Sequence, residues 1–359
     1  MRAISEIFDE TRLVVPVSRK SRPTGEIPVS GDCLSVIPLP DPEGSDLKRK
    51  LRLPFWLLNN LPTLIREIRR ADAVHTPIPG DIGTFGLLIA LLFRKPLFVR
   101  HCGNWFVRRT IAEFGWRWLL ERTAGKRTVV LATGGAATMP SDRNKHVRWI
   151  FSTSLREDEL KSVASVRSEV PQTGPRLIIS ARQELAKGTG PLIESLPMLE
   201  SEFPGISLDV VGDGGALAEF RRLALARGVA DRVIFHGKVD HTRVMTLLSK
   251  ADLFCFPTTS SEGFPKAVLE ALACGVPVVT TRVSVLPELV GNGSGLLLDD
   301  ASPAEIARGI RWCLSDSARY QALSSTAVGT ASQYSLERWR DKIAETLTVN
   351  WGPLRSLDA

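Results

Sequence analysis

The chain has 359 residues, which exceeds the usual size of one hydrophobic core and favours two domains. Lys and Arg outnumber Asp and Glu by 46 to 39, and the net charge of +7 suits an anionic ligand or an anionic surface. The basic residues do not alternate with aromatic ones and no zinc-finger or RNP-like motif occurs, so we expect no nucleic-acid binding.

The cysteines and the apolar runs bear on the cellular location. Cys33, Cys102, Cys255, Cys274 and Cys313 are scattered, odd in number and mostly in apolar surroundings, which indicates reduced packing residues. The amino-terminal residues lack the apolar core of a signal peptide. The longest apolar run, 87–93, is far shorter than the roughly 20 residues that a spanning helix needs. We therefore expect a cytoplasmic protein.

Short β-branched or apolar runs alternate with helical patterns, which is typical of parallel sheets covered by helices. The first half predicts a helix over 1–11 and strands over 13–17, 34–38, 73–75, 97–100, 128–132 and 147–150. The second half predicts strands over 177–180, 208–212, 233–236, 253–257, 276–280 and 296–298. Each half thus predicts one doubly wound α/β domain. A polar linker over 152–175, with a short helix near 156–166, joins them, and a helix over 335–351 follows the second.

The stretch 48–70 mixes basic and large apolar residues, as expected of an interfacial segment on anionic lipid. The alternative is a helix packed on the core with basic edges. Pro54 and Pro62 interrupt the helical pattern. Peripheral contact with an anionic membrane therefore stands as one of two interpretations.

A helix start in the second half has the features of an anion site. Pro265 suits the first position of a helix, and Gly275 suits its end. The dipole and the unpaired N–H groups of a helix N-terminus favour an anion such as a diphosphate. The N–H groups that would gather there belong to Gly263, Phe264 and Lys266.

Two acids lie eight positions apart around this helix start. Glu262 lies just outside the helix and Glu270 two turns inside it, on a helix so apolar that the acid must be buried and needs a partner. With a diphosphate between them, the two carboxylates can accept hydrogen bonds from hydroxyls on its two sides. The segment therefore predicts a site for a sugar nucleotide.

Residues 260–280, S-S-E-G-F-P-K-A-V-L-E-A-L-A-C-G-V-P-V-V-T, resemble the E-x7-E signature of family 4-like retaining glycosyltransferases. The resemblance extends to Ser180-Ala181-Arg182 with Lys187-Gly188, V-V-G-D-G-G over 210–215, D-R-V-I-F-H-G over 231–237 and A-D-L-F-C-F-P-T over 251–258. It is dense over about 176–299 and thin before. It implies the GT-B architecture, in which two Rossmann-like domains face each other across a cleft. Residues 1–165 would form the acceptor-side domain, 166–334 the nucleotide-sugar domain, and 335–359 a helix crossing back to the first domain.

The resemblance also implies roles for individual residues. Arg182 and Lys187 would hold the donor diphosphate, although such a pair taken alone is more often solvated. Glu262 would contact the hexose and Glu270 the ribose. The resemblance assigns neither acid as a covalent nucleophile, because such enzymes are thought to retain configuration by attack on the leaving-group face, with the donor phosphate as the base. Backbone groups of Gly263, Phe264 and Pro265 would line the phosphate site.

The other candidates have structural alternatives. The turn with Gly212 and Gly214 resembles a phosphate loop, but short glycine turns are more often structural. His236 and Gly237 end a strand where the family often contacts the base, and the alternative is a solvent-facing imidazole. His101 follows a strand and resembles the family histidine that approaches the donor sugar, against the alternative of a satisfied structural histidine. It completes the expected catalytic set of Glu262, His101, Arg182 and Lys187.

One departure from the family pattern bears on activity. Members normally begin with a strand and a Gly-rich loop, whereas this chain begins with the expected helix and what would be the second strand. A central strand and its loop are therefore expected to be absent, through a misplaced start codon, a natural truncation or a substitute segment. Such a gap costs free energy, because it leaves backbone groups unpaired.

With these patterns, the resemblance implies a metal-independent retaining glycosyltransferase that moves a hexose from a nucleoside diphosphate sugar to a glycan or lipid-linked acceptor in surface polysaccharide assembly. No D-x-D metal motif stands out, and the nucleotide sugar is a co-substrate with no further cofactor. Two alternatives remain open. One is a nucleotide-sugar epimerase of the same architecture, and the other is a catalytically impaired partner subunit that binds sugar nucleotide.

Overall fold

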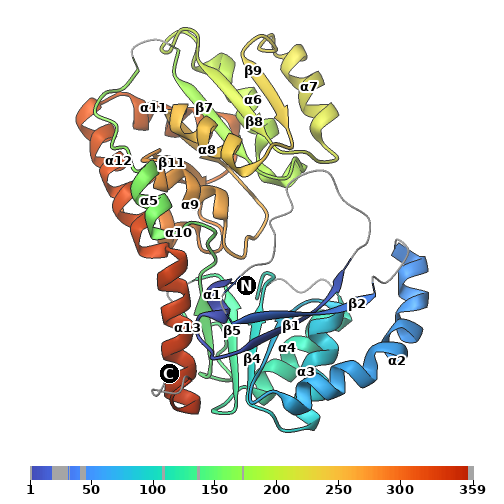
Figure 1. Cartoon of the computed structure of the whole chain (residues 1–359). Helices are drawn as coiled ribbons and strands as arrows, with labels where there is room; N and C mark the ends of the chain where they lie inside the picture. The colour runs from blue at the N-terminus through green and yellow to red at the C-terminus, as the bar shows by residue number, and fades with distance from the viewer. Residues whose placement is uncertain are drawn as a thin grey trace. The chain divides into compact units, whose positions relative to one another are not determined.

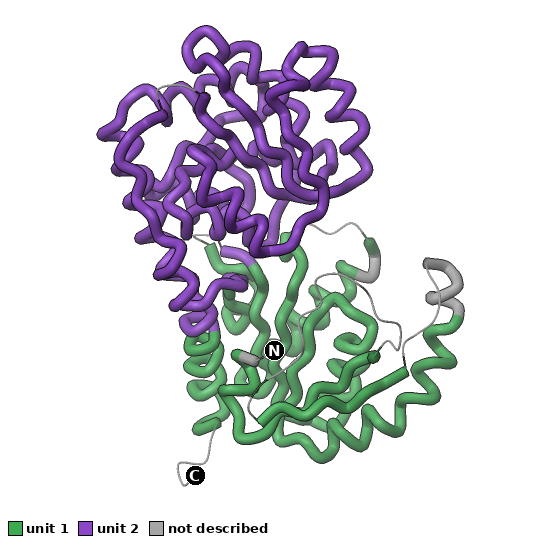
Figure 2. The backbone as a smooth tube through the Cα atoms, turned by 45° about the horizontal axis from the view of Figure 1, so that its top comes forward, with its two compact units in different colours: residues 1–133, 138–150, 340–359 green, residues 134–137, 151–339 purple. Residues whose placement is uncertain are grey.

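The computed structural model describes residues 2–17, 31, 33–40, 46–106, 110–135, 138–171 and 174–354. The chain divides into two compact units, coloured separately in Figure 2. Unit 1 comprises residues 1–133, 138–150 and 340–359, and unit 2 comprises residues 134–137 and 151–339. Each unit buries a hydrophobic core of its own. The main division falls after residue 150, compared with the predicted boundary after residue 165.

Unit 1 contains two parallel sheets. A two-stranded sheet pairs β1 (Thr11–Val17) with β2 (Leu34–Pro40). A four-stranded sheet runs in chain order through β3 (Val74–Ile78), β4 (Leu97–His101), β5 (Thr128–Thr133) and β6 (Val147–Ile150). Among the strands that the structure describes, none pairs with both β1 and β3, so the parallel strands of this unit fall into two separate sheets. The break lies where a central strand was expected to be absent.

The amino-terminal helix is much shorter than predicted. Helix α1 covers only Arg2–Ser5, a turn follows it, and Thr11 already opens β1. The remaining helices of unit 1 are α2 (Asp46–Arg70), α3 (Asp81–Leu92), α4 (Ile111–Thr123) and residues 340–351 of α13 (Leu336–Trp351).

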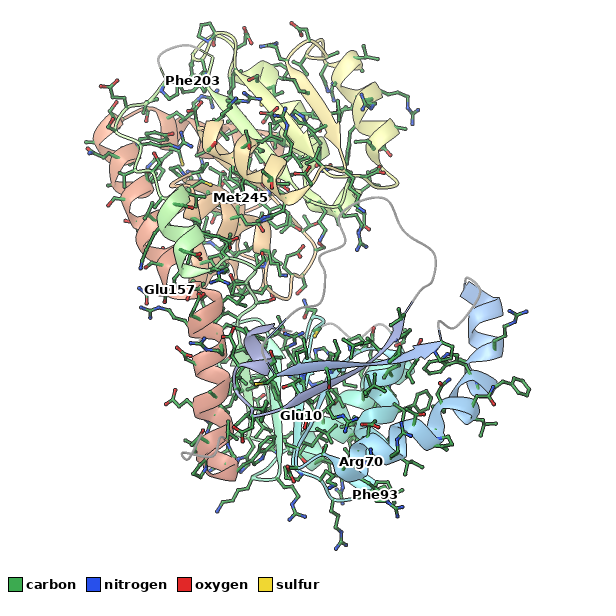
Figure 3. All side chains as sticks on the ribbon, in the orientation of Figure 1. Glu10, Arg70, Phe93, Glu157, Phe203 and Met245 are labelled. Atoms are coloured by element: carbon green, nitrogen blue, oxygen red, sulfur yellow. The ribbon has the colours of Figure 1, made fainter. Side chains whose placement is uncertain are left out.

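Helix α2 runs without interruption through Pro54 and Pro62, contrary to the prediction that these residues break it. Packing offsets the cost of the missing N–H groups, because Trp56 is buried and its Nε1 donates to the Pro40 carbonyl oxygen at 2.7 Å. At the other end of α2, Arg69 Cζ lies 4.8 Å from the centre of the Phe93 ring, so the ends of α2 and α3 lie together (Figure 3).

Unit 2 contains one six-stranded parallel sheet covered by helices (Figure 1). The spatial order of its strands is β9-β8-β7-β10-β11-β12, so the chain builds outward from β7 and then returns to place β10 on the other side of β7. This is the doubly wound Rossmann order, and its switch point lies between β7 and β10. The strands are β7 (Arg176–Ser180), β8 (Ser207–Val211), β9 (Val233–Gly237), β10 (Leu253–Phe256), β11 (Val278–Thr281) and β12 (Gly295–Leu298).

The helices of unit 2 lie before, between and after these strands. They are α5 (Glu157–Val163), η1 (Leu185–Lys187), α6 (Thr189–Ser195), η2 (Leu196–Met198), α7 (Leu217–Ala226), α8 (His241–Lys250), α9 (Lys266–Ala273), α10 (Leu286–Val290), α11 (Pro303–Leu314), α12 (Ser317–Ala331), η3 (Ser332–Tyr334) and residues 336–339 of α13. No helix within the described ranges has the length and apolar character needed to cross a bilayer.

Candidate functional site

Two loops are locked together at the switch point of the unit 2 sheet. One is η1 with Gly188, after β7, and the other begins at Pro257, after β10. Gly188 has a φ of +89°, and a Cβ atom there would lie 2.3 Å from the Pro257 carbonyl oxygen, so only glycine allows this approach. The Ala186 carbonyl accepts hydrogen bonds from the Thr259 N–H at 2.9 Å and the Thr258 hydroxyl at 3.1 Å. Ligands of parallel α/β sheets bind at such a position.

This junction brings Lys187 and Glu262 into contact. Lys187 Nζ donates to Glu262 Oε1, and Ser260 Oγ donates to the same oxygen at 3.3 Å. Ser284, after β11, donates to the main-chain carbonyl of Glu262. Only 17% of the Lys187 side chain and 18% of the Glu262 side chain are exposed. The sequence therefore identified two residues that form one partly buried ion pair.

Arg182 lies apart from this ion pair. Its side chain is 76% exposed, and Nη1 donates to Glu184 Oε1 at 3.3 Å. Exposed pairs of this kind contribute little to stability, so the Arg182 side chain can change partners at small cost. Lys187 is the shielded cation of the predicted pair.

Helix α9 begins one residue later than predicted. Pro265 is its N-cap, with φ −80° and ψ 94°, and its carbonyl accepts the N–H of Val268 at 3.1 Å. Gly275 follows the helix end as predicted. Phe264, just before the helix, packs with its ring centre 5.5 Å from that of Tyr334, which fixes the Gly263–Phe264 approach to the helix.

Glu270 is buried on α9, as its apolar neighbours predicted, and its partners are two residues that sequence reasoning missed. His241 Nε2 lies 3.2 Å from Glu270 Oε1, and Ser154 Oγ donates to the same oxygen at 3.3 Å. Burial raises the pKa of Glu270, while His241 and Ser154 act in the opposite direction. Both contacts end on Oε1, and no side chain in the described part of the chain is hydrogen-bonded to Oε2. His241 is the first residue of a helix that follows a strand, and this position is the one sequence feature that could have identified it.

The glycine turn after β8 has a structural role. A Cβ atom at Gly212 would lie 2.0 Å from the Ala181 carbonyl oxygen, and one at Gly214 would lie 2.3 Å from that of Gln183. Gln183 is fully buried, and its Nε2 donates to the carbonyls of Ala181 and Val211, each at 2.9 Å. This turn therefore supports the loop that carries Arg182 and Lys187. Gln183 was also missed, because no motif distinguishes it.

His236 points to a buried partner and not to solvent. Its Nε2 lies 2.6 Å from Asp209 Oδ1, and Arg176 donates to both oxygens of the same carboxylate. Burial alone would raise the pKa of Asp209, but the hydrogen bonds from Arg176 and His236 bring it below its ordinary value. The imidazole is thus held in a three-residue network across β7, β8 and β9. Gly237 contributes its carbonyl oxygen to the Gly212 N–H at 2.8 Å.

His101 belongs to unit 1 and ends β4. Its Nδ1 lies 3.1 Å from the Gly103 carbonyl oxygen, and its ring meets Trp105 edge-on with centres 5.1 Å apart. Burial is the main reason that the pKa of His101 lies below its usual value, which favours the neutral imidazole. Its predicted role at the donor stays a prediction. Within the described residues, no three His, Cys, Asp or Glu side chains gather as metal ligands.

Comparisons with known proteins show what this chain is similar to. Residues 163–328 match the family Glycosyl transferases group 1. The chain is 28% identical over 326 residues to a GDP-mannose-dependent alpha-(1-6)-phosphatidylinositol monomannoside mannosyltransferase of Mycolicibacterium smegmatis, which covers 81% of this chain and 80% of that protein. It is also 34% identical over 159 residues to a glycogen synthase of Mycobacterium tuberculosis. This alignment covers 44% of this chain and 38% of the glycogen synthase. The chain thus spans less than half the length of this second relative.

Solved structures share the fold at lower identity. A sucrose-phosphate synthase of Thermosynechococcus elongatus aligns with a TM-score of 0.72 and 18% identity over 96% of this chain and 90% of that one. HepE of Anabaena, solved with UDP and glucose, aligns with a TM-score of 0.66 and 19% identity. This alignment covers 88% of this chain and 86% of HepE. These likenesses show that the chain has the GT-B fold, and residues 163–328 within it match the group 1 glycosyltransferases.

Proposed function

We propose that this protein is a retaining glycosyltransferase that transfers a hexose from a nucleoside diphosphate sugar held by unit 2. The observation that carries the proposal is the meeting of Lys187 and Glu262 at the switch point of a Rossmann sheet. A shielded ammonium there suits a diphosphate, and a carboxylate beside it suits the hydroxyls of a sugar. Glu270, with one carboxylate oxygen still available, suits the ribose.

Lys187 stabilises the negative charge that grows on the nucleoside diphosphate as it leaves, which is where a fixed cation lowers the barrier most. Arg182 adds a second cation from its exposed position. Glu262 orients the hexose, and the donor phosphate accepts the proton of the acceptor hydroxyl. No step of this scheme requires a metal ion.

The acceptor is proposed to be a glycan or a lipid-linked sugar of surface polysaccharide assembly, with unit 1 and His101 on the acceptor side. A mannosyltransferase relative is named for a phosphatidylinositol acceptor, which supports a lipid-linked one. The comparisons do not favour the epimerase alternative. The donor nucleotide stays open, since that relative is named for GDP-mannose and HepE was solved with UDP.

We also propose peripheral contact with the cytoplasmic face of an anionic membrane through the first half of α2. Phe55 and Leu58 are 72% and 64% exposed on this helix, and residues 48, 49, 50 and 52 are Lys or Arg. Apolar side chains flanked by cations are the pattern of an interfacial helix.

Donor binding is tested by thermal unfolding with UDP, GDP and their glucose and mannose conjugates. A ligand at 100 times its Kd stabilises the folded state by about 2.7 kcal/mol, so the matching nucleotide sugar should raise Tm clearly. Glu270→Ala should abolish the shift, whereas Glu219→Ala, an exposed acid on α7, should retain it. An unchanged shift in Glu270→Ala would contradict the ribose role, and no shift with any nucleotide sugar would contradict donor binding.

The reaction class is tested by product analysis. Incubation of the matching nucleotide sugar without acceptor should yield no epimer, and addition of membrane-extracted acceptors should yield a glycosylated product with retained configuration. A donor that binds but is neither hydrolysed nor transferred would identify a binding subunit instead of an enzyme.

A further inference from the structure

We propose that the Lys187–Glu262 ion pair is a lock on the donor site that a diphosphate opens, so that Glu262 is released for the hexose only when a diphosphate takes Lys187. This inference rests on the proposed donor site and adds a specificity rule to it: free hexose is rejected and activated hexose is accepted. The same two residues would then provide both the attraction for donor and the barrier to non-donors.

The shielding of the pair supports such a lock. Both side chains are more than four-fifths buried, and Glu262 Oε1 accepts from Ser260 Oγ as well as from Lys187 Nζ. An ion pair screened from water is stronger than an exposed one, and removing one partner leaves an uncompensated charge. A neutral hexose offers no charge to either residue, so it gains too little to separate them.

The backbone on both sides of the pair is held in place, so only the side chains can exchange partners. Gly188 lies against Pro257, and the Ala186 carbonyl accepts a hydrogen bond from the Thr259 N–H. On the other side, Ser284 holds the main chain of Glu262. Lys187 and Glu262 therefore cannot drift apart by a loop movement without breaking these contacts, and the lock opens by rotation of side chains.

A diphosphate can compete where a hexose cannot. It carries more negative charge than one carboxylate, and the ammonium can donate three hydrogen bonds to its oxygens. Once Lys187 donates to the diphosphate, Glu262 is a shielded carboxylate without its cation, and hexose hydroxyls can satisfy it. The hexose is thus recognised after the diphosphate.

The lock makes an unusual prediction for Glu262→Gln. This change keeps the side-chain shape but removes the charge that competes for Lys187, so UDP or GDP without sugar should bind roughly threefold to tenfold more tightly. The extra affinity that the hexose normally adds should fall to near zero. Lys187→Met should weaken the same nucleotide by roughly 10- to 100-fold, because a charged hydrogen-bond donor is lost.

The experiment is calorimetric titration of UDP, GDP and the matching nucleotide sugar into the full chain and its variants. Glu194→Gln is the matched control, because it removes one carboxylate of another ion pair in unit 2, that with Arg227, and should leave nucleotide affinity within twofold. The double variant Lys187→Met/Glu262→Gln completes a cycle, in which the gain from Glu262→Gln should vanish once Lys187 is absent.

The outcomes separate the lock from the donor site itself. If wild type binds nucleotide and Lys187→Met weakens it, but Glu262→Gln leaves nucleotide affinity equal or lower, the lock is wrong while the donor site stands. A gain that persists without Lys187 would also overturn it. If wild type binds no nucleotide, the donor site fails as well. Should Glu262→Gln unfold, Glu262→Ala in the same cycle gives the same distinction.

Discussion

At the scale of single residues, the buried carboxyl group of Glu270 lowers the stability of the folded protein. Burial raises its pKa, so folding disfavours the Glu270 carboxylate more than it disfavours the protonated acid. His241 and Ser154 compensate on Oε1 without cancelling this effect. Acids in such environments are concentrated at functional sites, where stability is exchanged for binding.

The pH dependence of stability tests this interpretation. Because the folded pKa of Glu270 lies above its ordinary value of 4.5, its contribution is most favourable below that pH and is lost as pH rises through the folded pKa. Glu270→Gln should therefore raise Tm at pH 7 by about 1–3 °C, and the difference should shrink as pH falls towards 4.5. Melting curves from pH 4.5 to 8 measure both effects. A lower Tm for Glu270→Gln than for wild type at pH 7 would contradict the proposal that the buried carboxylate destabilises the folded protein.

At the scale of elements, the glycine turn after β8 is a matched test of close packing. A Cβ atom at Gly214 would meet the main-chain oxygen and nitrogen of Gln183 at 2.3 Å and 2.8 Å, whereas one at Gly215 would meet nothing within 4 Å. We expect Gly214→Ala to destabilise the protein by about 1–3 kcal/mol, and Gly215→Ala to change stability by less than about 0.5 kcal/mol. Denaturant unfolding measures the free energy of unfolding of both variants. Equal changes in the two variants would show that the turn tolerates a side chain at Gly214.

The same elements show what sequence patterns can predict. Apolar runs located all twelve strands that the structure describes, because the residues that a strand buries against the core are close together in the sequence. The pairing of strands is not local, so the sequence indicated an absent central strand but not that β1 and β2 pair as a sheet separate from β3–β6. The continuity of α2 through two prolines was missed for a related reason, since packing of Trp56 overrides local propensity.

The residues of the candidate site likewise include some that the sequence identified and some that only the fold reveals. Lys187, Glu262 and Glu270 lie in motifs with fixed spacing, and the sequence identified them. Ser154 and Gln183 carry no motif. Ser154 bonds to a residue 116 positions away, a contact that only the folded chain creates. His236 fits a motif, but Asp209 holds it in a structural network.

At the scale of the whole molecule, the two units have separate cores, so we expect that a surface of unit 1 can be altered without disturbing the proposed donor site of unit 2. The exposed side chains of Phe55 and Leu58 are the surface in question, beside the basic first turns of α2. Each basic residue near an anionic bilayer contributes about 1 kcal/mol, and salt screens this attraction. Binding to lipid should therefore need both the anionic headgroups and the two apolar side chains.

Flotation with vesicles tests this surface. Wild type should bind phosphatidylglycerol-containing vesicles, bind phosphatidylcholine vesicles weakly, and lose binding as salt rises. Phe55→Ser/Leu58→Ser should weaken binding more than tenfold, because burying two such side chains contributes about 1.5–3 kcal/mol each. Leu225→Ser is the control, since Leu225 is 70% exposed on α7 of unit 2. Both variants should keep the nucleotide-sugar Tm shift, so equal binding by wild type and the double variant would refute the lipid surface and leave donor recognition untouched.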